Sequence, residues 1–132
     1  MAVTTAKNYP VKYVFGYSKA YGGWHSGVDR PMPTGTPIFV NTIKIGLSGN
    51  TGYSTGPHLH ISKLDSKGNF LDPGNEGFTF YGGLPGRRPR VLATGKDTRN
   101  GKWVKIQNWN RTRTYVYCHL DKVTCVAGER IK

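Results

Sequence analysis

A glycine-rich run that ends in two histidines constrains the fold of this chain more than any other stretch. It extends from Ser48 to His60 and reads Ser-Gly-Asn-Thr-Gly-Tyr-Ser-Thr-Gly-Pro-His-Leu-His. Glycine and proline at this density predict consecutive turns, and the last three residues are typical of the start of a strand. Because successive side chains of a strand point to opposite faces, His58 and His60 share one face and Leu59 can be buried on the other. The spacing alone fits a pair of zinc ligands and also fits an ordinary half-buried pair.

The composition predicts a single small all-β domain. A chain of 132 residues supports one modest hydrophobic core, so residues 1–132 are expected to form one domain. Its 18 glycines, 8 prolines and 12% aromatic residues favour turns and short strands, and no window has the sustained apolar spacing of an amphipathic helix. We therefore expect an antiparallel sheet with long connecting loops, the longest being a surface connection over residues 63–90.

The chain is strongly basic, with 19 Lys and Arg against 7 Asp and Glu and a formal net charge of +12. This charge predicts attraction to polyanions, whether nucleic acid, anionic lipid or the phosphate-rich polymers of a bacterial wall, and does not choose among them. No apolar run is long enough to span a bilayer, so no membrane span is expected. The initial Met-Ala-Val-Thr-Thr lacks the basic start and apolar core of a signal peptide, which predicts synthesis in the cytoplasm.

Cys118 and Cys125 are the two cysteines of the sequence. They could pair across a tight turn, but a chain made in a reducing cytoplasm is expected to keep them as thiols. No second cysteine pair is present to complete a zinc site, so neither residue is interpreted as a metal ligand.

Strands and turns are expected along the whole chain. The aromatic and β-branched run over residues 9–17 predicts a first strand, and the turn at 65–69 predicts a hairpin that closes onto residues 70–73. Further strands are expected at residues 37–40, 42–47, 78–81, 90–94, 103–107 and 114–120.

Alternation along the last of these strands sorts its side chains onto two faces. It places Tyr115, Tyr117 and His119 together on one face, and it places Val116, Cys118 and Leu120 on the other. The first face would suit the floor of a groove that contains His119. An ordinary sheet face with amphipathic residues fits the same pattern.

The four histidines of the chain fall in three motifs. His25 begins a His-x3-Asp motif, His58 and His60 form His-x-His, and His119 belongs to Tyr-x-His-Leu. A lone His-x3-Asp is common by chance in surface loops. Together, however, His25, Asp29 and His60 supply two nitrogens and one carboxylate oxygen, a complete set of three protein ligands for a catalytic zinc whose fourth position is left to water.

These motifs resemble the M23 family of lysostaphin-like zinc metallopeptidases. The His-Ser-Gly-Val-Asp of residues 25–29, followed by Pro-Thr-Gly-Thr-Pro at 33–37, is similar to the family's first motif. Residues 46–60 match its glycine-rich signature almost throughout, and Tyr-Cys-His-Leu at 117–120 is similar to its remaining histidine strand. The resemblance covers most of the chain except residues 63–90, and it implies the lysostaphin-like fold.

One departure from the family concerns the order of the motifs. In the usual order the Tyr-x-His-Leu strand lies between the first motif and the glycine-rich signature, whereas here it comes last. The chain therefore resembles a circular rearrangement of the family's sheet, and in this respect it is most similar to the catalytic domain of a phage lysin. This predicts that Lys132 ends close to the strand at 42–46 and that residues 63–90 lead back to Val91.

The resemblance implies an endopeptidase that binds one Zn²⁺ per chain and hydrolyses peptide bonds of bacterial peptidoglycan. It implies His25, Asp29 and His60 as zinc ligands, His58 as the general base, and His119 as the group that steadies the attacking water or the developing oxyanion. The family cleaves glycine bridges, D-Ala to diamino acid links and stem bonds, and the sequence does not choose among them. Substrate-binding residues stay unknown, with these candidates for the groove walls: Trp24, Tyr53, Tyr115 and Tyr117.

The expected partners are peptidoglycan and anionic wall polymers, met by a monomer at the bacterial cell wall after release by phage or outside the cell. Three other interpretations stay open. A D-Ala-D-Ala type zinc peptidase would need a glutamate base, and neither Glu76 nor Glu129 lies near a histidine motif. A non-catalytic wall-binding or regulatory relative would normally lack metal ligands. Binding to nucleic acid, which we do not expect, would leave the four histidines without a purpose.

Overall fold

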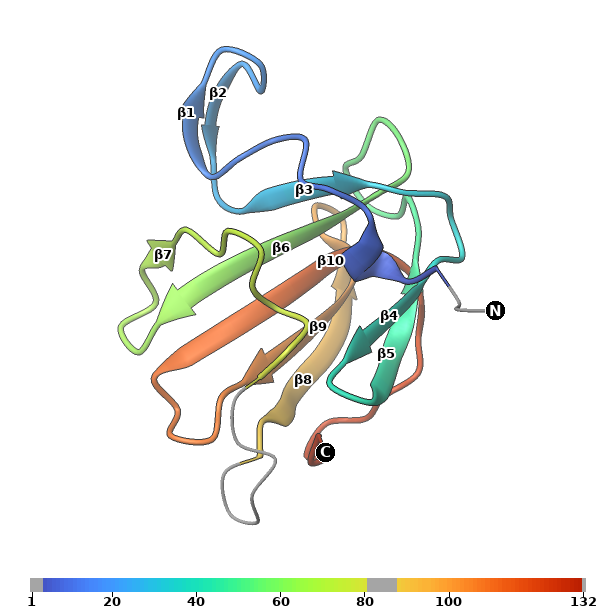
Figure 1. Ribbon diagram of the computed structural model, residues 1–132, viewed down its shortest axis with the longest axis vertical. Coiled ribbons are helices and arrows are strands. Elements are labelled where there is room, and N and C mark those ends of the chain that lie inside the picture. Colours follow the sequence, from blue (N-terminus) through green and yellow to red (C-terminus); the bar gives the residue numbers. More distant parts are fainter. Residues whose placement is uncertain (1–3, 81–87, 132) are drawn as a thin grey trace.

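The computed structural model describes residues 4–80 and 88–131, which form a nearly all-β fold (Figure 1). Most strands belong to one antiparallel sheet with the order β3-β6-β10-β5-β4, to which β7 adds beside β6 and the β8–β9 hairpin adds beside β10. The elements are η1 (Ala6–Asn8), β1 (Gly16–Ser18), β2 (Gly23–His25), β3 (Val28–Pro31), β4 (Pro37–Val40), β5 (Ile43–Ser48), β6 (His58–Asp65), β7 (Phe70–Leu71), β8 (Arg90–Asp97), β9 (Gly101–Gln107) and β10 (Arg113–Val123). The described residues contain no helix that is long and apolar enough to cross a membrane. The prediction of an all-β class is confirmed.

Strand β10 is the centre of the sheet because it pairs with three others. It pairs with β6 along residues 113–118, with β9 along 114–120, and with β5 along 120–123. Its residues 115–120 are all buried, as expected for a strand that is covered on both faces. The last strand of the sequence therefore joins the histidine strand β6 to the β8–β9 hairpin.

The core lies on one side of this sheet. Alternation along β6 places Leu59 and Ile61 in it at 0% exposure, while His58 and His60 face the other side. These strand residues pack with aliphatic side chains of the other strands and with Tyr117, which is also fully buried. The predicted division of the His-Leu-His run between two faces is thus confirmed.

A β-bulge in β10 corrects the predicted division of its side chains. The pairing registers with β9 and with β5 both shift near His119, whose backbone has a φ of 65°. Such a bulge turns one side chain to the other face. Tyr117 and Leu120 consequently lie in the core, whereas the ring of His119 lies 4.7 Å from that of His58 on the opposite face. The prediction that His119 shares a face with Tyr115 and Tyr117 is wrong.

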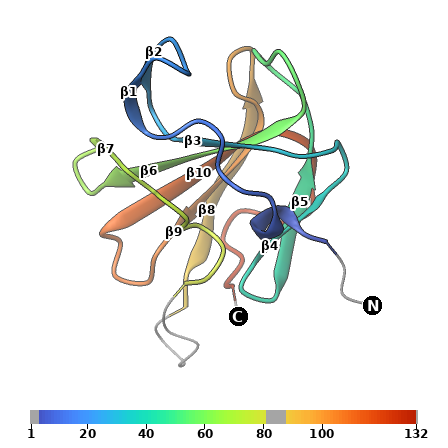
Figure 2. The same ribbon diagram turned by 45° about the horizontal axis from the view of Figure 1, so that its top comes forward.

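Two other predicted strands are absent or displaced. Residues 9–15 are not a strand, because Lys12 and Tyr13 both donate their N–H groups to the Asp29 carbonyl in an isolated bridge. The chain becomes extended only at β1, which pairs with β2 as a separate hairpin that projects beyond β3 (Figure 2). Residues 78–80 also form no strand, although Phe78 is buried in the core, and Tyr81 lies outside the described residues.

The predicted turn at 65–69 does close a hairpin between β6 and β7. At the other end of the 63–90 connection the chain reaches β8 beside the C-terminal residues, where Val91 donates to the Glu129 carbonyl and Ile131 donates to the Pro89 carbonyl. Thr124 donates its N–H to the carbonyl of Ile45 at 2.9 Å, so the chain after β10 runs beside β5. Lys132, predicted to lie near the strand at 42–46, is outside the described residues.

The hydroxyl of Tyr117 should contribute measurably to stability. It is fully buried and donates to the Gly77 carbonyl at 2.6 Å, which ties the connection to β10. Tyr117→Phe leaves this buried carbonyl without a partner, so we expect a loss of about 1–3 kcal/mol in the free energy of unfolding, measured by urea denaturation. The control Tyr17→Phe, at an 84% exposed side chain, should leave stability unchanged. Equal stability of Tyr117→Phe and the wild type would contradict the assigned role.

The two cysteines are free thiols in the structure, and each is buried. Burial raises the pKa of Cys118 to about 12 and that of Cys125 to about 11, so neither forms the reactive thiolate near neutral pH. We expect a thiol reagent at about pH 8, near the reference thiol pKa, to modify the folded protein far more slowly than the unfolded one. Unfolding in denaturant should then release two reactive thiols per chain. Recovery of no thiols after unfolding would instead demonstrate a disulfide.

Candidate metal centre

Asp29 and His60 meet because β3 and β6 pair in a register that sets these two residues opposite each other. Directly opposed residues of antiparallel strands point to the same face and have close Cβ atoms. His25 ends β2, and the short link through Ser26 and Gly27 returns the chain so that its ring also faces Asp29. A Cβ at Gly27 would lie 2.2 Å from the Ile61 carbonyl oxygen and 2.9 Å from His60 Nε2. Only glycine fits at this position against β6.

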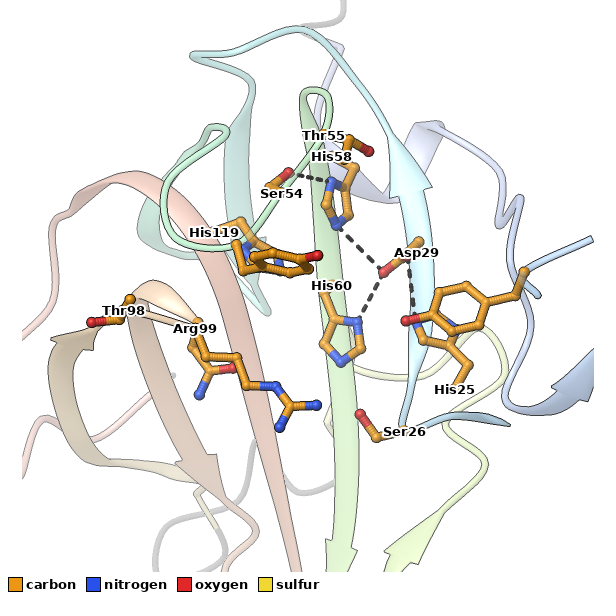
Figure 3. A pocket seen from close by; sticks show the side chains of 13 residues that line it. His25, Ser26, Asp29, Ser54, Thr55, His58, His60, Thr98, Arg99 and His119 are labelled. Atoms are coloured by element: carbon orange, nitrogen blue, oxygen red, sulfur yellow. Dashed lines mark hydrogen bonds and ion pairs between the residues drawn. The ribbon is translucent and has the colours of Figure 1, made fainter. Parts of the chain in front are cut away.

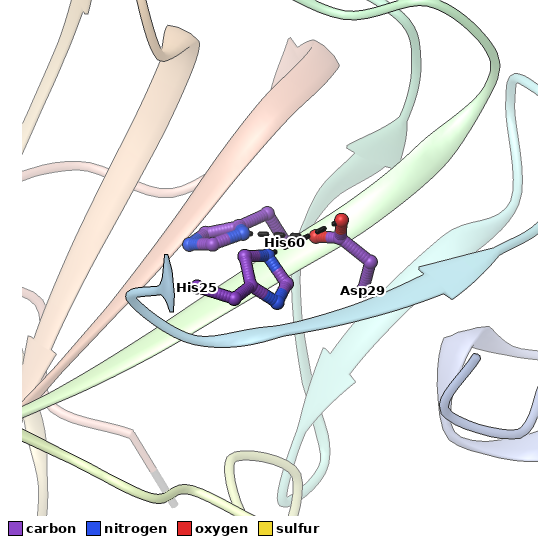
Figure 4. Close-up of side chains that lie close together, drawn as sticks. All are labelled: His25, Asp29 and His60. Carbon is purple, nitrogen blue, oxygen red and sulfur yellow. Dashed lines mark hydrogen bonds and ion pairs between the residues drawn. The ribbon is translucent and has the colours of Figure 1, made fainter. Parts of the chain in front are cut away.

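The three residues predicted as zinc ligands form one cluster (Figure 4). Asp29 Oδ2 lies 3.3 Å from His25 Nε2, and Asp29 Oδ1 lies 2.9 Å from His60 Nδ1. One donor atom from each residue can be chosen so that all lie within 4.8 Å of one another. The prediction that His25, Asp29 and His60 converge on one point is confirmed.

Neighbouring groups orient both histidine rings of this cluster. His25 Nδ1 lies 3.1 Å from the Val14 carbonyl oxygen, which can only accept, so Nδ1 donates to it and Nε2 is the nitrogen that faces Asp29. His60 Nε2 lies 2.8 Å from the hydroxyl of Ser62, which leaves Nδ1 to face Asp29. Partners of this kind on the second ring nitrogen are typical of metal-binding histidines.

Asp29 is a buried anion with no lysine or arginine paired to it among the described residues. Its side chain contacts three imidazoles, the third being His58, whose Nε2 lies 3.6 Å from Oδ1. Burial opposes ionisation, but hydrogen bonds from His25 and His60 and the charges of His60 and His58 outweigh it and hold the pKa of Asp29 well below its ordinary value. The carboxylate is therefore charged at neutral pH. A buried charge of this kind is stable when it is paired or coordinates a metal.

His58 and His119 lie next to the cluster without belonging to it. His58 Nδ1 lies 2.8 Å from the Gly56 carbonyl oxygen, and His119 Nδ1 lies 2.7 Å from that of Thr51. Each ring therefore donates from Nδ1, which leaves Nε2 as the nitrogen that is free to face the site. Burial lowers the pKa of His119 and favours its neutral form. The carbonyls of Gly56 and Thr51, both in the glycine-rich loop, thus fix the orientation of these two rings, so that each can act through Nε2 as a proton acceptor or hydrogen-bond partner.

All four histidines line one open groove of about 570 Å³ (Figure 3). This volume is in the ordinary range for ligand sites. Tyr53 lines the groove as expected, and Trp24 lines a second cavity that adjoins it. Tyr115 and Tyr117 line neither, because alternation along β10 directs both toward the core. Their prediction as groove walls is wrong.

The sequence analysis missed several residues that complete this site. Gly27 allows the link after His25 to approach β6 closely, and Ser62 orients His60 from two residues along the same strand face. Ser62 could have been found from the period-2 pattern of β6. Arg99 and Asn100, from the β8–β9 turn, also line the groove, and no local signal in the sequence connects that turn with the histidines.

A scan of protein-family models gives no match to this chain, and a search of solved structures gives none either.

The cluster predicts a clear division among variants in metal binding. Asp29→Asn and His60→Ala remove a donor atom and should abolish tight binding of Zn²⁺, measured by titration calorimetry and by the metal content of the purified protein. Ser62→Ala should weaken binding by roughly 10–100-fold, the usual cost of losing an outer hydrogen-bond partner. His58→Ala should keep one Zn²⁺ per chain. Loss of metal from His58→Ala but not from His60→Ala would reverse the ligand assignment.

Proposed function

We propose that this protein is a zinc-dependent endopeptidase that hydrolyses peptide bonds of bacterial peptidoglycan, with a lysostaphin-like fold of the M23 type in rearranged order. The observation that carries the proposal is the joint placement of His25, Asp29 and His60 as one donor cluster with two further imidazoles in the same open groove. Three protein ligands plus an open side are the usual composition of a catalytic zinc site, whereas structural sites are closed by four.

The residues present fit a divalent cation. His25, Asp29 and His60 would hold it through two imidazole nitrogens and one carboxylate oxygen, a donor set that zinc commonly takes in hydrolases. The buried negative charge of Asp29, paired only with histidines among the described residues, is an independent reason for a cation here. When bound, zinc supplies Lewis acidity and lowers the pKa of a coordinated water to roughly 7.

His58 would act as the general base. Its Nδ1 donates to the Gly56 carbonyl and its Nε2 lies 3.6 Å from Asp29 Oδ1, so in the neutral ring Nε2 is the nitrogen that can accept a proton. The proton taken from the attacking water would pass from His58 to the amine of the leaving peptide. His119, whose ring centroid lies 4.7 Å from that of His58, would accept at Nε2 to orient the attacking water, and would donate there to the developing oxyanion once Nε2 has gained a proton.

The open groove and the charge of the chain support an extended polymeric substrate. The groove is bordered by Tyr53, Ser54 and Thr55 of the glycine-rich loop, of which Ser54 and Thr55 have small side chains. The formal net charge of +12 would attract the molecule to a wall rich in phosphate polymers. Peptidoglycan combines short peptides with such polymers, and this combination favours it over a soluble protein substrate.

Other assignments fit the site less well. A D-Ala-D-Ala type peptidase would need a glutamate base, yet Glu76 is hydrogen-bonded to Tyr115 and paired with Lys63, and Glu129 accepts from the Val126 amide. Neither glutamate lines the groove of the histidines. A wall-binding relative without activity would not need the complete donor set and the two oriented imidazoles.

The activity assay separates these assignments. Zinc-loaded wild type should clear purified bacterial walls in a zymogram and a turbidity assay, and a chelator should abolish the clearing, which added Zn²⁺ restores. His58→Ala should retain zinc but lose about 10²–10⁴-fold in rate, the usual contribution of a general base. Wall binding without clearing by the zinc-loaded wild type, across walls of different cross-bridge chemistry, would support the non-catalytic alternative and overturn the proposal.

A further inference from the structure

A second cavity continues the groove past His60 along the sheet. It has a volume of about 490 Å³ and shares Ser26, His60, Arg99 and Asn100 with the groove of the histidines. A peptide that extends across the metal centre would place one of its side chains in this second cavity. The residues that line it therefore bear on which peptide is accepted.

The two long walls of the second cavity differ in chemistry. Trp24 of β2 and Phe70 of β7 form an aromatic wall, with ring centroids 5.8 Å apart and side chains that are 45% and 43% exposed. Across the floor, which is formed by β6 and β10, the facing wall carries Arg99 from the β8–β9 turn and Lys105 from β9. An aromatic wall facing a cationic wall suits a side chain that combines an aliphatic stem with a negative charge.

The turn that carries Arg99 is fixed to the catalytic face rather than free. The Arg99 carbonyl accepts from the Tyr53 N–H at 2.9 Å, and the Asn100 carbonyl accepts from the His119 N–H at 2.8 Å. The glycine-rich loop is in direct backbone contact with this segment, since a Cβ at Gly52 would lie 2.2 Å from the nitrogen of Gly101, the first residue of β9, and 2.8 Å from the Arg99 carbonyl oxygen. These backbone contacts anchor the turn that carries Arg99 beside the bulge that presents His119.

The guanidinium of Arg99 has no carboxylate partner among residues 4–80 and 88–131. Asp97 accepts the backbone N–H groups of Arg99 and Asn100 instead, and Asp29 is enclosed by histidines. In Figure 3 the Arg99 side chain extends from its turn into the groove on the side of His60 and Ser26. A planar guanidinium with free donors is the side chain best matched to a carboxylate, which it can bind through two parallel hydrogen bonds.

We propose that Arg99 is a specificity-determining residue that binds a free carboxylate on the substrate peptide, next to the bond that is cut. The proposal rests on the peptidase function proposed above and narrows its substrate class. Peptides of the stem type, which carry free carboxylates on γ-linked or diamino acid residues, would be preferred over glycine bridges, which offer no side chain to the second cavity.

Binding of two matched peptides tests this assignment. Both are stem peptides with one γ-linked glutamate, whose α-carboxylate is free in the first and a carboxamide in the second. Calorimetric titration of the zinc-loaded His58→Ala protein, in which turnover is blocked, should give about tenfold tighter binding of the free acid, the size of one good charge-assisted hydrogen-bond pair. Adding Arg99→Gln should remove this preference, and adding Arg99→Lys should restore only part of it.

Two control variants separate charge from position. Arg111→Gln makes the same change in net charge at an exposed residue of the β9–β10 turn, outside both cavities, and should keep the tenfold preference. Trp24→Ala should weaken the acid and the amide by the same factor, because it removes only apolar contact.

Equal affinity of the zinc-loaded His58→Ala protein for both peptides would overturn the proposal that Arg99 binds a substrate carboxylate. A preference for the free acid that survives Arg99→Gln would overturn it as well. Wall clearing by the wild type is measured in parallel. If the wild type clears walls although the Arg99 assignment has failed, the peptidase function stands without this subsite. If neither peptide binds and no wall is cleared, both proposals fail.

Discussion

The pairing of Asp29 with His60 across two antiparallel strands is the contact on which the rest of the site depends. Their opposition in the β3–β6 register brings a carboxylate within 2.9 Å of an imidazole nitrogen. A shift of this register by one residue would turn one of the two side chains to the core. The burial of Leu59 and Ile61 on the other face of β6 therefore fixes the site as well as the fold. Hydrophobic packing and metal-ligand geometry are two consequences of one alternation.

The bulge in β10, the strand next to β6, places His119 on the same side of the sheet as His58 and His60. Regular alternation would keep Tyr117 in the core and send His119 there as well. The extra residue at the bulge separates their faces, and His119 adopts a left-handed backbone with φ of 65° to do so. A non-glycine residue in this region carries a conformational cost, and such costs concentrate at functional sites. The hydrogen bonds of His119 to Thr51 and Asn100 offset that cost here.

Short-range patterns in the sequence were sufficient for the all-β class and for the faces of the His-Leu-His run, whereas the convergence of His25, Asp29 and His60 was expected only from the separate motifs taken together. Period-2 alternation assigned His58, Leu59 and His60 to the correct faces, because β6 is regular and has one buried face. The same rule failed at His119, since a bulge depends on pairing with two neighbours and leaves no mark in the local sequence. It also failed at residues 9–15, whose β-branched and aromatic side chains suit a strand but whose N–H groups are drawn to the Asp29 carbonyl.

The placement of Arg99 in the groove could not be predicted from the sequence for a different reason. Thirty-nine positions separate it from His60, and only the insertion of β10 between β6 and β9 makes them neighbours. Contacts between such distant segments determine a fold but cannot be read from the period of either segment alone.

The position of β10 between β6 and β9 also affects the order in which the sheet can form during synthesis. Residues 113–123 follow every other strand of the described sheet in the sequence, and without them β6 has no strand of that sheet to connect it with the β8–β9 hairpin. A nascent chain that has been made only as far as residue 60 already contains His25, Asp29 and His60. It still lacks β10, which forms part of the cavity floor, and the β8–β9 hairpin, which forms the facing wall. The cleft around these donors is therefore completed only once β10 has joined the sheet.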